Sequence, residues 1–215
     1  MNKKYGAIVT DVQGCFTTWK TGSLAVPGSD EAYVKSVEAA TQRLKEEGFF
    51  MVATQDWHPP DHVSFASNHP GKSPFDTVQI NGRAQVLWPV HCVQGTEDAK
   101  LLIDNTLFEA VVRKAQNPQF DSYSAFKDDR GIKTELEAIL HEHGVTSTVI
   151  YGIATDYCVR ATAIDLVLAG FRVVAVEQLC RGVMPETSAQ ALELMQAEGV
   201  RIIKDFNIRE IKPLM

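Results

Sequence analysis

The sequence has few cysteines, no excess of positive charge and no long hydrophobic run. Its 215 residues include four cysteines, and 21 basic against 27 acidic side chains give a formal net charge of −6. The cysteines are scattered without a CxxC pair, which argues against a disulfide scaffold or a zinc finger and makes a reducing compartment the simpler expectation. Because no basic block is present, a nucleic-acid partner is not expected.

The chain also lacks the signs of membrane insertion and of division into several domains. No stretch approaches the roughly 18 apolar residues that a membrane span needs. The first apolar run is short and ends at the acidic Asp11, so neither a signal peptide nor an anchor is expected. Because no membrane segment is expected, we expect a soluble cytoplasmic protein. Because repeats and linker-like segments are also lacking, we expect one domain over residues 1–215.

Short apolar runs rich in β-branched residues alternate with longer segments of helical periodicity. Because the runs are continuously apolar, they indicate strands covered on both faces, as in a parallel sheet. We expect strands at residues 5–10, 49–54, 109–113, 147–151, 172–176 and 200–203, and helices at residues 30–47, 97–101, 133–143, 157–169 and 185–198. This order predicts an α/β fold of three layers, α-β-α, with a central, mostly parallel six-stranded sheet.

Residues 56–93 lack clear periodicity and are rich in proline, histidine, glycine and tryptophan. An irregular stretch of this length in a compact domain is usually functional or conceals elements that the pattern does not reveal.

Polar groups follow four of the expected strands. In chain order they are Asp11, then Asp56 with His58, then Lys114, and then the segment from Gly152 to Cys158. Ligands of open α/β sheets bind beyond the carboxyl ends of the strands. Polar residues often begin at strand ends, but four complementary groups at four successive ends indicate chemistry.

Cys158 lies in the expected first turn of a helix that follows a strand. Backbone N–H groups and the helix dipole lower the pKa of a thiol there, which favours a nucleophilic thiolate, although a free cysteine is more often a small buried hydrophobe. Asp11 would accept the thiol proton, and Lys114 would hold the carboxylate and thiolate charges together. Cys15 and Cys180 lack such a setting and are expected to be inert.

A second group combines a carboxylate with imidazoles. Asp56, His58 and His62 lie close together in the sequence, and His91 arrives from later in the chain. Zinc, iron and manganese prefer these oxygen and nitrogen donors, whereas the simpler alternative is a set of surface histidines. Cys92 lies beside a candidate ligand, and its role stays open.

Three aromatic residues lie near these groups in the sequence. Phe16, Trp88 and Tyr123 would form the walls of a slot for a flat ring, although each alone is typical of core packing. The remaining histidines have no comparable setting and receive no role: His69, His141 and His143.

Together these residues resemble the nicotinamidases (pyrazinamidases), a group of isochorismatase-like cysteine hydrolases. The matching segments extend over nearly the whole chain and read VTDVQ, TQDWHPPDHVSFA, WPVHCVQGT, VVRK and GIATDYCVRATAIDLVLAGF. The metal-ligand set separates this group from isochorismatases without a metal. The resemblance implies an amidohydrolase that converts nicotinamide to nicotinate and ammonia in NAD salvage.

The resemblance also implies roles for the candidate residues. The catalytic triad would be Asp11, Lys114 and Cys158, and a divalent ion, most often zinc with iron or manganese as alternatives, would be held by Asp56, His58, His62 and His91. A cis peptide bond between Ile153 and Ala154 would direct the backbone N–H groups of Ala154 and Cys158 toward an oxyanion.

The mechanism implied by the resemblance is acyl transfer. The metal would hold the pyridine nitrogen while Phe16 and Trp88 flank the ring, and Cys158 would attack the carboxamide to form a thioester. Asp11 would relay the proton to the departing ammonia and then activate the water that releases nicotinate.

The sequence departs from the common family pattern near the expected pocket. Cys15 stands where a carboxylate is common, Ala115 where glycine is usual, and residues 116–122 differ from the usual glycine- and tyrosine-rich stretch. These departures leave the substrate more open than the reaction class.

Three other functions are weighed against a nicotinamidase. The closest is a related hydrolase that acts on another small amide or carbamoyl compound. A phosphatase of the haloacid dehalogenase type needs a second aspartate where Gln13 stands, and a silent ligand-binding relative would have lost a triad member. We expect a small-molecule substrate, no nucleic acid or membrane partner, and leave a homo-oligomer open.

Overall fold

A parallel sheet of six strands forms the centre of the protein. The computed structural model describes residues 5–80 and 82–215, and the strand order is β5-β2-β1-β6-β7-β8, with every neighbouring pair parallel. The strands are β1 (Tyr5–Thr10), β2 (Phe50–Asp56), β5 (Ala110–Lys114), β6 (Ser147–Ile153), β7 (Arg172–Arg181) and β8 (Arg201–Ile203). The predicted α/β fold with a six-stranded central sheet is confirmed.

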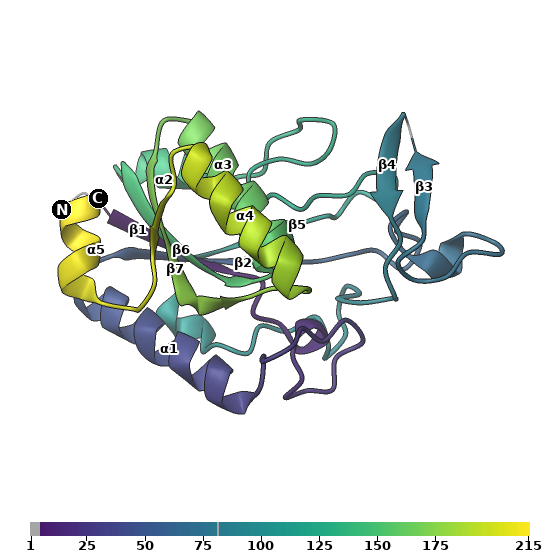
Figure 1. Ribbon diagram of the computed structural model, residues 1–215, viewed down its shortest axis with the longest axis horizontal. Helices are drawn as coiled ribbons and strands as arrows, with labels where there is room; N and C mark the ends of the chain where they lie inside the picture. Colours follow the sequence, from purple (N-terminus) through teal and green to yellow (C-terminus); the bar gives the residue numbers. More distant parts are fainter. Residues whose placement is uncertain (1–4, 81) are drawn as a thin grey trace.

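Helices cover both faces of this sheet (Figure 1). On one face lies α1 (Glu31–Glu46), and on the other lie α2 (Leu136–Glu142), α3 (Arg160–Leu168) and α4 (Pro185–Ala197). Asp30 caps α1 by accepting a hydrogen bond from the Tyr33 backbone N–H. The sheet is therefore shielded on both faces, as its continuously apolar strands require.

The last helix, α5 (Ile208–Leu214), lies beside the end of α1, where Lys212 pairs with Glu47. No segment was predicted there, because Pro213 in its last turn masks the helical pattern. No helix among the described residues is long and apolar enough to cross a membrane.

Strands β1 and β6 approach each other closely where they end. Thr10 pairs with Gly152, whose φ is +129°, and a Cβ atom at Gly152 would collide with the Thr10 backbone. Glycine is required at this position both for the backbone conformation and for space. The close approach brings Asp11 next to the turn that follows β6.

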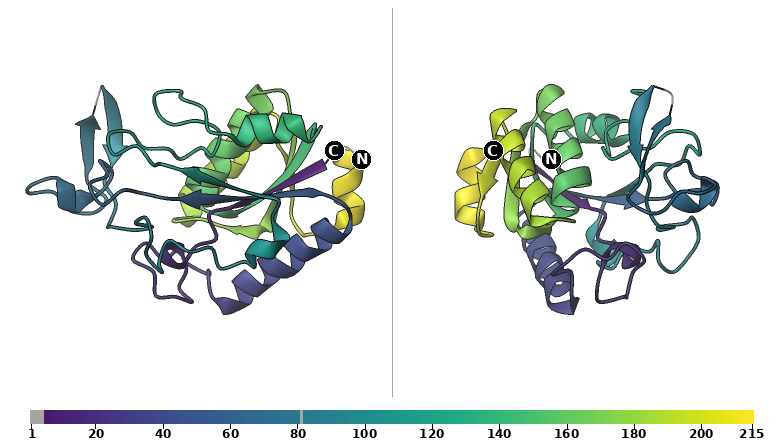
Figure 2. Two further views of the ribbon diagram at one scale, coloured as in Figure 1. Left: turned by 180° about the vertical axis from the view of Figure 1, so that it is seen from behind. Right: turned by 45° about the vertical axis from the view of Figure 1, so that its right-hand side comes forward.

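Two local predictions are corrected. Residues 97–101, predicted as a helix, form turns and a bridge between Gln13 and Leu101, because so short a segment cannot maintain a helix without supporting contacts. Residues 56–93 contain an unpredicted hairpin of β3 (Thr77–Ile80) and β4 (Arg83–Val86), which stands apart from the main sheet (Figures 1 and 2).

Candidate active site

Four neighbouring strands bring the predicted polar groups to one edge of the sheet. Asp56 and Lys114 are the last residues of β2 and β5 and are partners in the strand register. Asp11 directly follows β1, and Ala154 directly follows β6. Because these strands are adjacent in the order β5-β2-β1-β6, their four carboxyl ends lie side by side.

Lys114 is a buried cation that connects these groups. Its Nζ lies 3.0 Å from Asp11 Oδ2 and 3.4 Å from Cys158 Sγ, and it also contacts Asp56 Oδ1. It donates a further hydrogen bond to the Ser122 carbonyl at 3.1 Å. Burial opposes the charge, but Asp11 and Asp56 outweigh this effect and hold the pKa of Lys114 well above its usual value. Lys114 therefore stays protonated.

Asp11 is placed to exchange a proton with a neighbour. Its Oδ1 accepts a hydrogen bond of 2.6 Å from Thr54 Oγ1, and its backbone has a φ of +48°. Burial raises the pKa of the Asp11 carboxyl, while Lys114 lowers it. The ligand atoms of Asp11, Asp56 and Cys158 lie within 4.8 Å of one another. A buried carboxyl with a raised pKa beside a thiol suits general acid–base work.

Cys158 occupies a π-helical turn, Thr155–Val159, between β6 and α3, and not the first turn of an α-helix as predicted. Such turns occur frequently at functional sites. Burial raises the pKa of the Cys158 thiol well above its usual value, although Lys114 acts in the opposite direction. The predicted lowering of this pKa is wrong, because burial outweighs the nearby positive charge of Lys114. The thiol keeps its proton until a base removes it.

The peptide bond between Ile153 and Ala154 is cis, as the resemblance implies. Ala154 and Cys158 both line the pocket. Their backbone N–H groups stay the predicted donors to an oxyanion.

Two groups of candidate metal ligands share His58. Asp56, His58 and His91 form one group, and His58, His62 and Asp121 form the other; within each group the ligand atoms lie within 4.8 Å of one another. Within residues 5–80 and 82–215, neither ring nitrogen of the buried His58 makes a hydrogen bond, although its Nε2 lies 3.6 Å from Asp56 Oδ2. Buried polar atoms without partners require an explanation, and a bound ion would supply one. The carboxylate and imidazole donors fit zinc, iron or manganese.

The other imidazoles are held by their surroundings. His91 Nδ1 lies 2.8 Å from the Pro89 carbonyl, and His62 Nδ1 lies 2.8 Å from Ser64 Oγ. His62 Nε2 also lies 3.3 Å from the Phe120 carbonyl, so both ring nitrogens of His62 already have hydrogen-bond partners in the protein. Burial lowers the pKa of His91 to about 3 and that of His62 to about 4. Both rings are therefore neutral near pH 7, as metal ligation requires.

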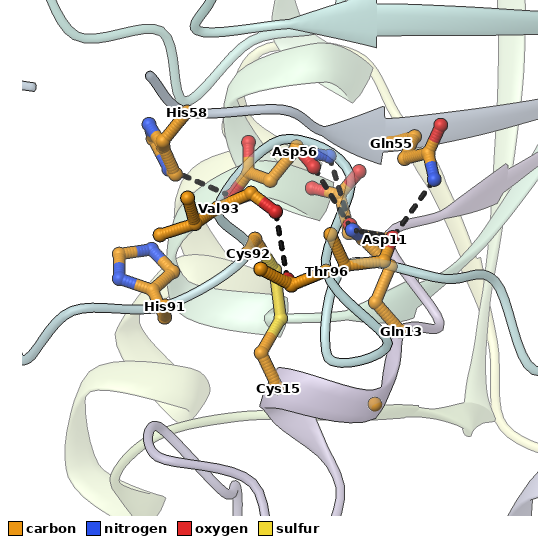
Figure 3. Close-up of a disulfide and its surroundings, with 12 residues drawn as sticks. Asp11, Gln13, Cys15, Gln55, Asp56, His58, His91, Cys92, Val93 and Thr96 are labelled. Carbon is orange, nitrogen blue, oxygen red and sulfur yellow. Dashed lines mark hydrogen bonds and ion pairs between the residues drawn. A yellow bond between two sulfur atoms is a disulfide. The ribbon is translucent and has the colours of Figure 1, made fainter. Parts of the chain in front are cut away.

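Gln13 holds the end of β2 in place beside these ligands (Figure 3). Its Nε2 donates to the carbonyls of Asp56 and Ala99 at 2.9 and 2.8 Å, and its Oε1 accepts from the Asp56 backbone N–H at 2.8 Å. Sequence reasoning used Gln13 to exclude a phosphatase and as part of the matching segment VTDVQ, and gave it no role in the site. The hydrogen bonds of its side-chain amide position Asp56, a role that only the folded structure reveals.

The pocket beside these polar groups has aromatic walls. The predicted ring-binding residues Phe16, Trp88 and Tyr123 all line it, together with four residues that sequence reasoning missed: Leu24, Val26, Tyr157 and Val183. Trp88 Nε1 donates to Tyr123 Oη at 3.2 Å, and the rings of Trp88 and Tyr157 meet edge to face at 5.0 Å. Asp121 also lines the pocket, and its only sequence signal is its place in the departing segment 116–122.

Cys15 and Cys92 form a disulfide, with their Cα atoms 5.7 Å apart (Figure 3). The prediction that the scattered cysteines stay unpaired, with Cys15 inert, is therefore wrong. The two residues are separated by 77 positions, and only the fold brings the turn after β1 against the segment that follows β4. Cys158 and Cys180 are the free cysteines of the described chain.

Comparisons with known proteins place this geometry in a family. Residues 6–205 match the isochorismatase domain family. The chain belongs to the isochorismatase domain family. Within this family, a nicotinamidase of Acinetobacter baylyi is 44% identical over 205 residues, which cover 94% of this chain and 92% of that protein.

Solved structures show the same likeness. A pyrazinamidase of Pyrococcus horikoshii in complex with zinc has a TM-score of 0.79 and 34% identity, and the match covers 94% of this chain and 99% of that chain. The yeast nicotinamidase bound to the inhibitor nicotinaldehyde has a TM-score of 0.87 and 29% identity, with 94% and 100% coverage. The isochorismatase-like fold thus extends over nearly the whole chain.

Proposed function

We propose that the protein is a nicotinamidase, which hydrolyses nicotinamide to nicotinate and ammonia through a thioester on Cys158. The observation that carries this proposal is the buried cluster in which Lys114 contacts Asp11, Asp56 and Cys158 at once. This cluster joins a nucleophile and its base to a metal-ligand group beside an aromatic slot. Relatives that are themselves nicotinamidases support the choice of substrate.

The first half of the reaction forms the thioester. Asp11 takes the thiol proton as Cys158 Sγ attacks the carboxamide carbon, and Lys114 stays charged and balances the negative charge that passes between them. The backbone N–H groups of Ala154 and Cys158 stabilise the oxyanion, an interaction worth about 3–4 kcal/mol in barrier height. Asp11 then returns the proton to the amide nitrogen, the C–N bond breaks and ammonia leaves.

The second half releases the acid. Asp11 removes a proton from a water molecule, whose oxygen attacks the thioester carbon, and the C–S bond breaks. Cys158 regains its proton and nicotinate leaves. The raised pKa of the buried Asp11 carboxyl suits this repeated uptake and return of one proton.

Asp56, His58 and His91 would hold a divalent ion, with His62 and Asp121 beside them. A bound ion supplies a Lewis-acid position for the ring nitrogen of the substrate. We favour zinc, because neutral imidazoles with one carboxylate are donors that it prefers, and because a related pyrazinamidase was solved with zinc.

An ammonia-release assay on a panel of amides, combined with elemental analysis, tests this proposal. The metal-loaded protein is expected to turn over nicotinamide and pyrazinamide, and to lose most of its activity on benzamide, which lacks the ring nitrogen. Turnover of an aliphatic amide or carbamoyl compound, with none of nicotinamide, would replace the proposed substrate by the closest alternative. Equal rates on benzamide and nicotinamide would remove the role assigned to the ring nitrogen.

A further inference from the structure

The disulfide between Cys15 and Cys92 lies directly behind the pocket. Both residues are completely buried. Cys15 precedes Phe16, an aromatic wall of the pocket, and Cys92 follows His91, a candidate metal ligand (Figure 3). The bond therefore joins two distant segments that each supply a residue to the same pocket.

Cys92 is also connected to a second candidate ligand. Its backbone carbonyl accepts a hydrogen bond of 3.1 Å from the His58 N–H, and a bridge pairs His58 with Val93. The rings of Phe16 and His91 lie 5.5 Å apart, measured between their centroids. The covalent link thus fixes one wall of the ring slot relative to two imidazoles of the metal-ligand group.

Regular secondary structure does little to fix this spacing. Cys15 lies in a single 3-10 turn, Gly14–Phe16, and Cys92 lies in an irregular segment with a φ of +47°. A residue other than glycine resists that left-handed conformation. Backbone hydrogen bonds from Gly14 to the Lys100 carbonyl and from Cys15 to the Asp98 carbonyl, at 3.2 and 2.8 Å, join the two segments only beyond Cys92. The disulfide adds a covalent bond at Cys92 itself, directly beside His91, to these hydrogen bonds.

We propose that the disulfide between Cys15 and Cys92 is a brace that positions Phe16 against His91 and His58 for binding of the substrate ring and the metal. This inference rests on the proposed function. The brace acts on binding, whereas acyl transfer takes place at Cys158, which the bond does not touch. Opening the brace is expected to weaken binding more than it slows the chemical step.

A small dithiol is expected to reduce the bond; because both cysteines are completely buried, the reaction needs local opening of the two segments and prolonged treatment. The dithiol supplies two electrons and is oxidised to its cyclic disulfide, the S–S bond between Cys15 and Cys92 breaks, and each sulfur takes up one of the two protons that the reagent releases. Reduction therefore gives a reversible perturbation that needs no substitution.

The oxidation state is the first measurement. Protein purified without reductant is denatured in the presence of an alkylating reagent and analysed by peptide mass spectrometry. The expected result is a linked peptide pair containing Cys15 and Cys92, with alkyl groups on Cys158 and Cys180. Alkylation of all four cysteines would overturn the proposal.

The second measurement separates positioning from simple stabilisation. Cys15→Ser, Cys92→Ser and the double variant are compared with Cys180→Ser, which replaces a buried cysteine away from the pocket. Each brace variant is expected to raise the KM for nicotinamide about two- to tenfold, the range for ordering one side chain and its loop, with kcat within about twofold. The two single variants and the double variant should be equivalent because they remove the same bond.

Zinc affinity gives a readout that does not depend on turnover. Calorimetry is expected to show weaker zinc binding in the brace variants and in dithiol-treated wild type, with no change in Cys180→Ser; the dithiol, which itself chelates zinc, is removed under anaerobic conditions before each titration. Dithiol treatment of the double variant should change nothing. A lower Tm with unchanged KM and unchanged zinc affinity would show a merely stabilising cross-link and overturn the proposal. If wild type fails to hydrolyse nicotinamide, the proposed function fails. The zinc measurements still test whether the disulfide positions the metal ligands.

Discussion

Replacing Lys114 by methionine keeps most of the side-chain volume and removes the buried positive charge that Asp11 and Asp56 share. Both carboxyl groups stay buried, with Asp11 0% and Asp56 4% exposed, so solvent cannot fully replace the lost partner. Removal of one member of a buried ion pair costs about 3 to 5 kcal/mol. For a chain of this length, that loss lowers the Tm by about 6 to 20 °C.

The cost of protonating one aspartate gives a second value for the stability that Lys114→Met loses. The stranded pair can relieve its repulsion by taking up one proton, which at pH 7 costs about 4 kcal/mol for a carboxyl with an ordinary pKa of 3.8. This cost declines as the pH falls toward the ordinary pKa, because the proton then becomes easier to acquire. The Lys114→Met variant should therefore approach wild-type stability in mildly acidic solution.

Urea unfolding and ammonia release measure the two consequences. Lys127→Met is a matched control, because Lys127 pairs with Asp165 while its side chain is 42% exposed, and loss of such a pair costs at most about 1 kcal/mol. The double variant Lys114→Met with Asp11→Asn should recover stability without recovering turnover. If Lys114→Met and Lys127→Met unfold at the same urea concentration, the reasoning about the buried cluster is refuted.

Three further predictions concern the nucleophile, the metal ligands and the neutral imidazoles. Cys158→Ala should lower ammonia release by more than about a thousandfold while calorimetry still detects nicotinamide binding, and undiminished turnover would exclude the cysteine mechanism. Asp121→Asn should weaken zinc binding by about tenfold or more, with the exposed Asp205→Asn as control, and equal zinc affinities of the two variants would argue against a role for Asp121. In metal-free protein, His91 binds a proton more readily in the unfolded chain than in the folded one, where its pKa is about 3 against an ordinary 6.5. Stability should therefore fall below pH 6.5, by about 2 kcal/mol at pH 5 for this histidine, and a flat urea-unfolding profile over that range would contradict the shift.

The sheet could be predicted because strands covered on both faces are continuously apolar. Residues 147–151, for example, were predicted as a strand that the structure extends to Ser147–Ile153. The hairpin of β3 and β4 gave no such signal, since its residues are mostly exposed or half-buried. Local apolar pattern therefore identified the strands of the core and missed the exposed hairpin.

The strand ends also located Asp11, Asp56 and Lys114, because parallel neighbours must finish at the same edge. Other parts of the site depend on how irregular segments pack against that edge. Neither the disulfide nor the place of Asp121 follows from spacing, since both depend on loops whose course is set by tertiary contacts. The raised pKa of the Cys158 thiol likewise follows from burial of this side chain in the folded protein, which the sequence does not display.

The covalent intermediate on Cys158 tests the central claim most directly. Metal-loaded protein is mixed with nicotinamide, quenched in acid during the first turnovers and analysed by peptide mass spectrometry. The account predicts a nicotinoyl group on the peptide that contains Cys158, which disappears as the substrate is exhausted. Accumulation of nicotinate while Cys158 stays unmodified at every time point would contradict it.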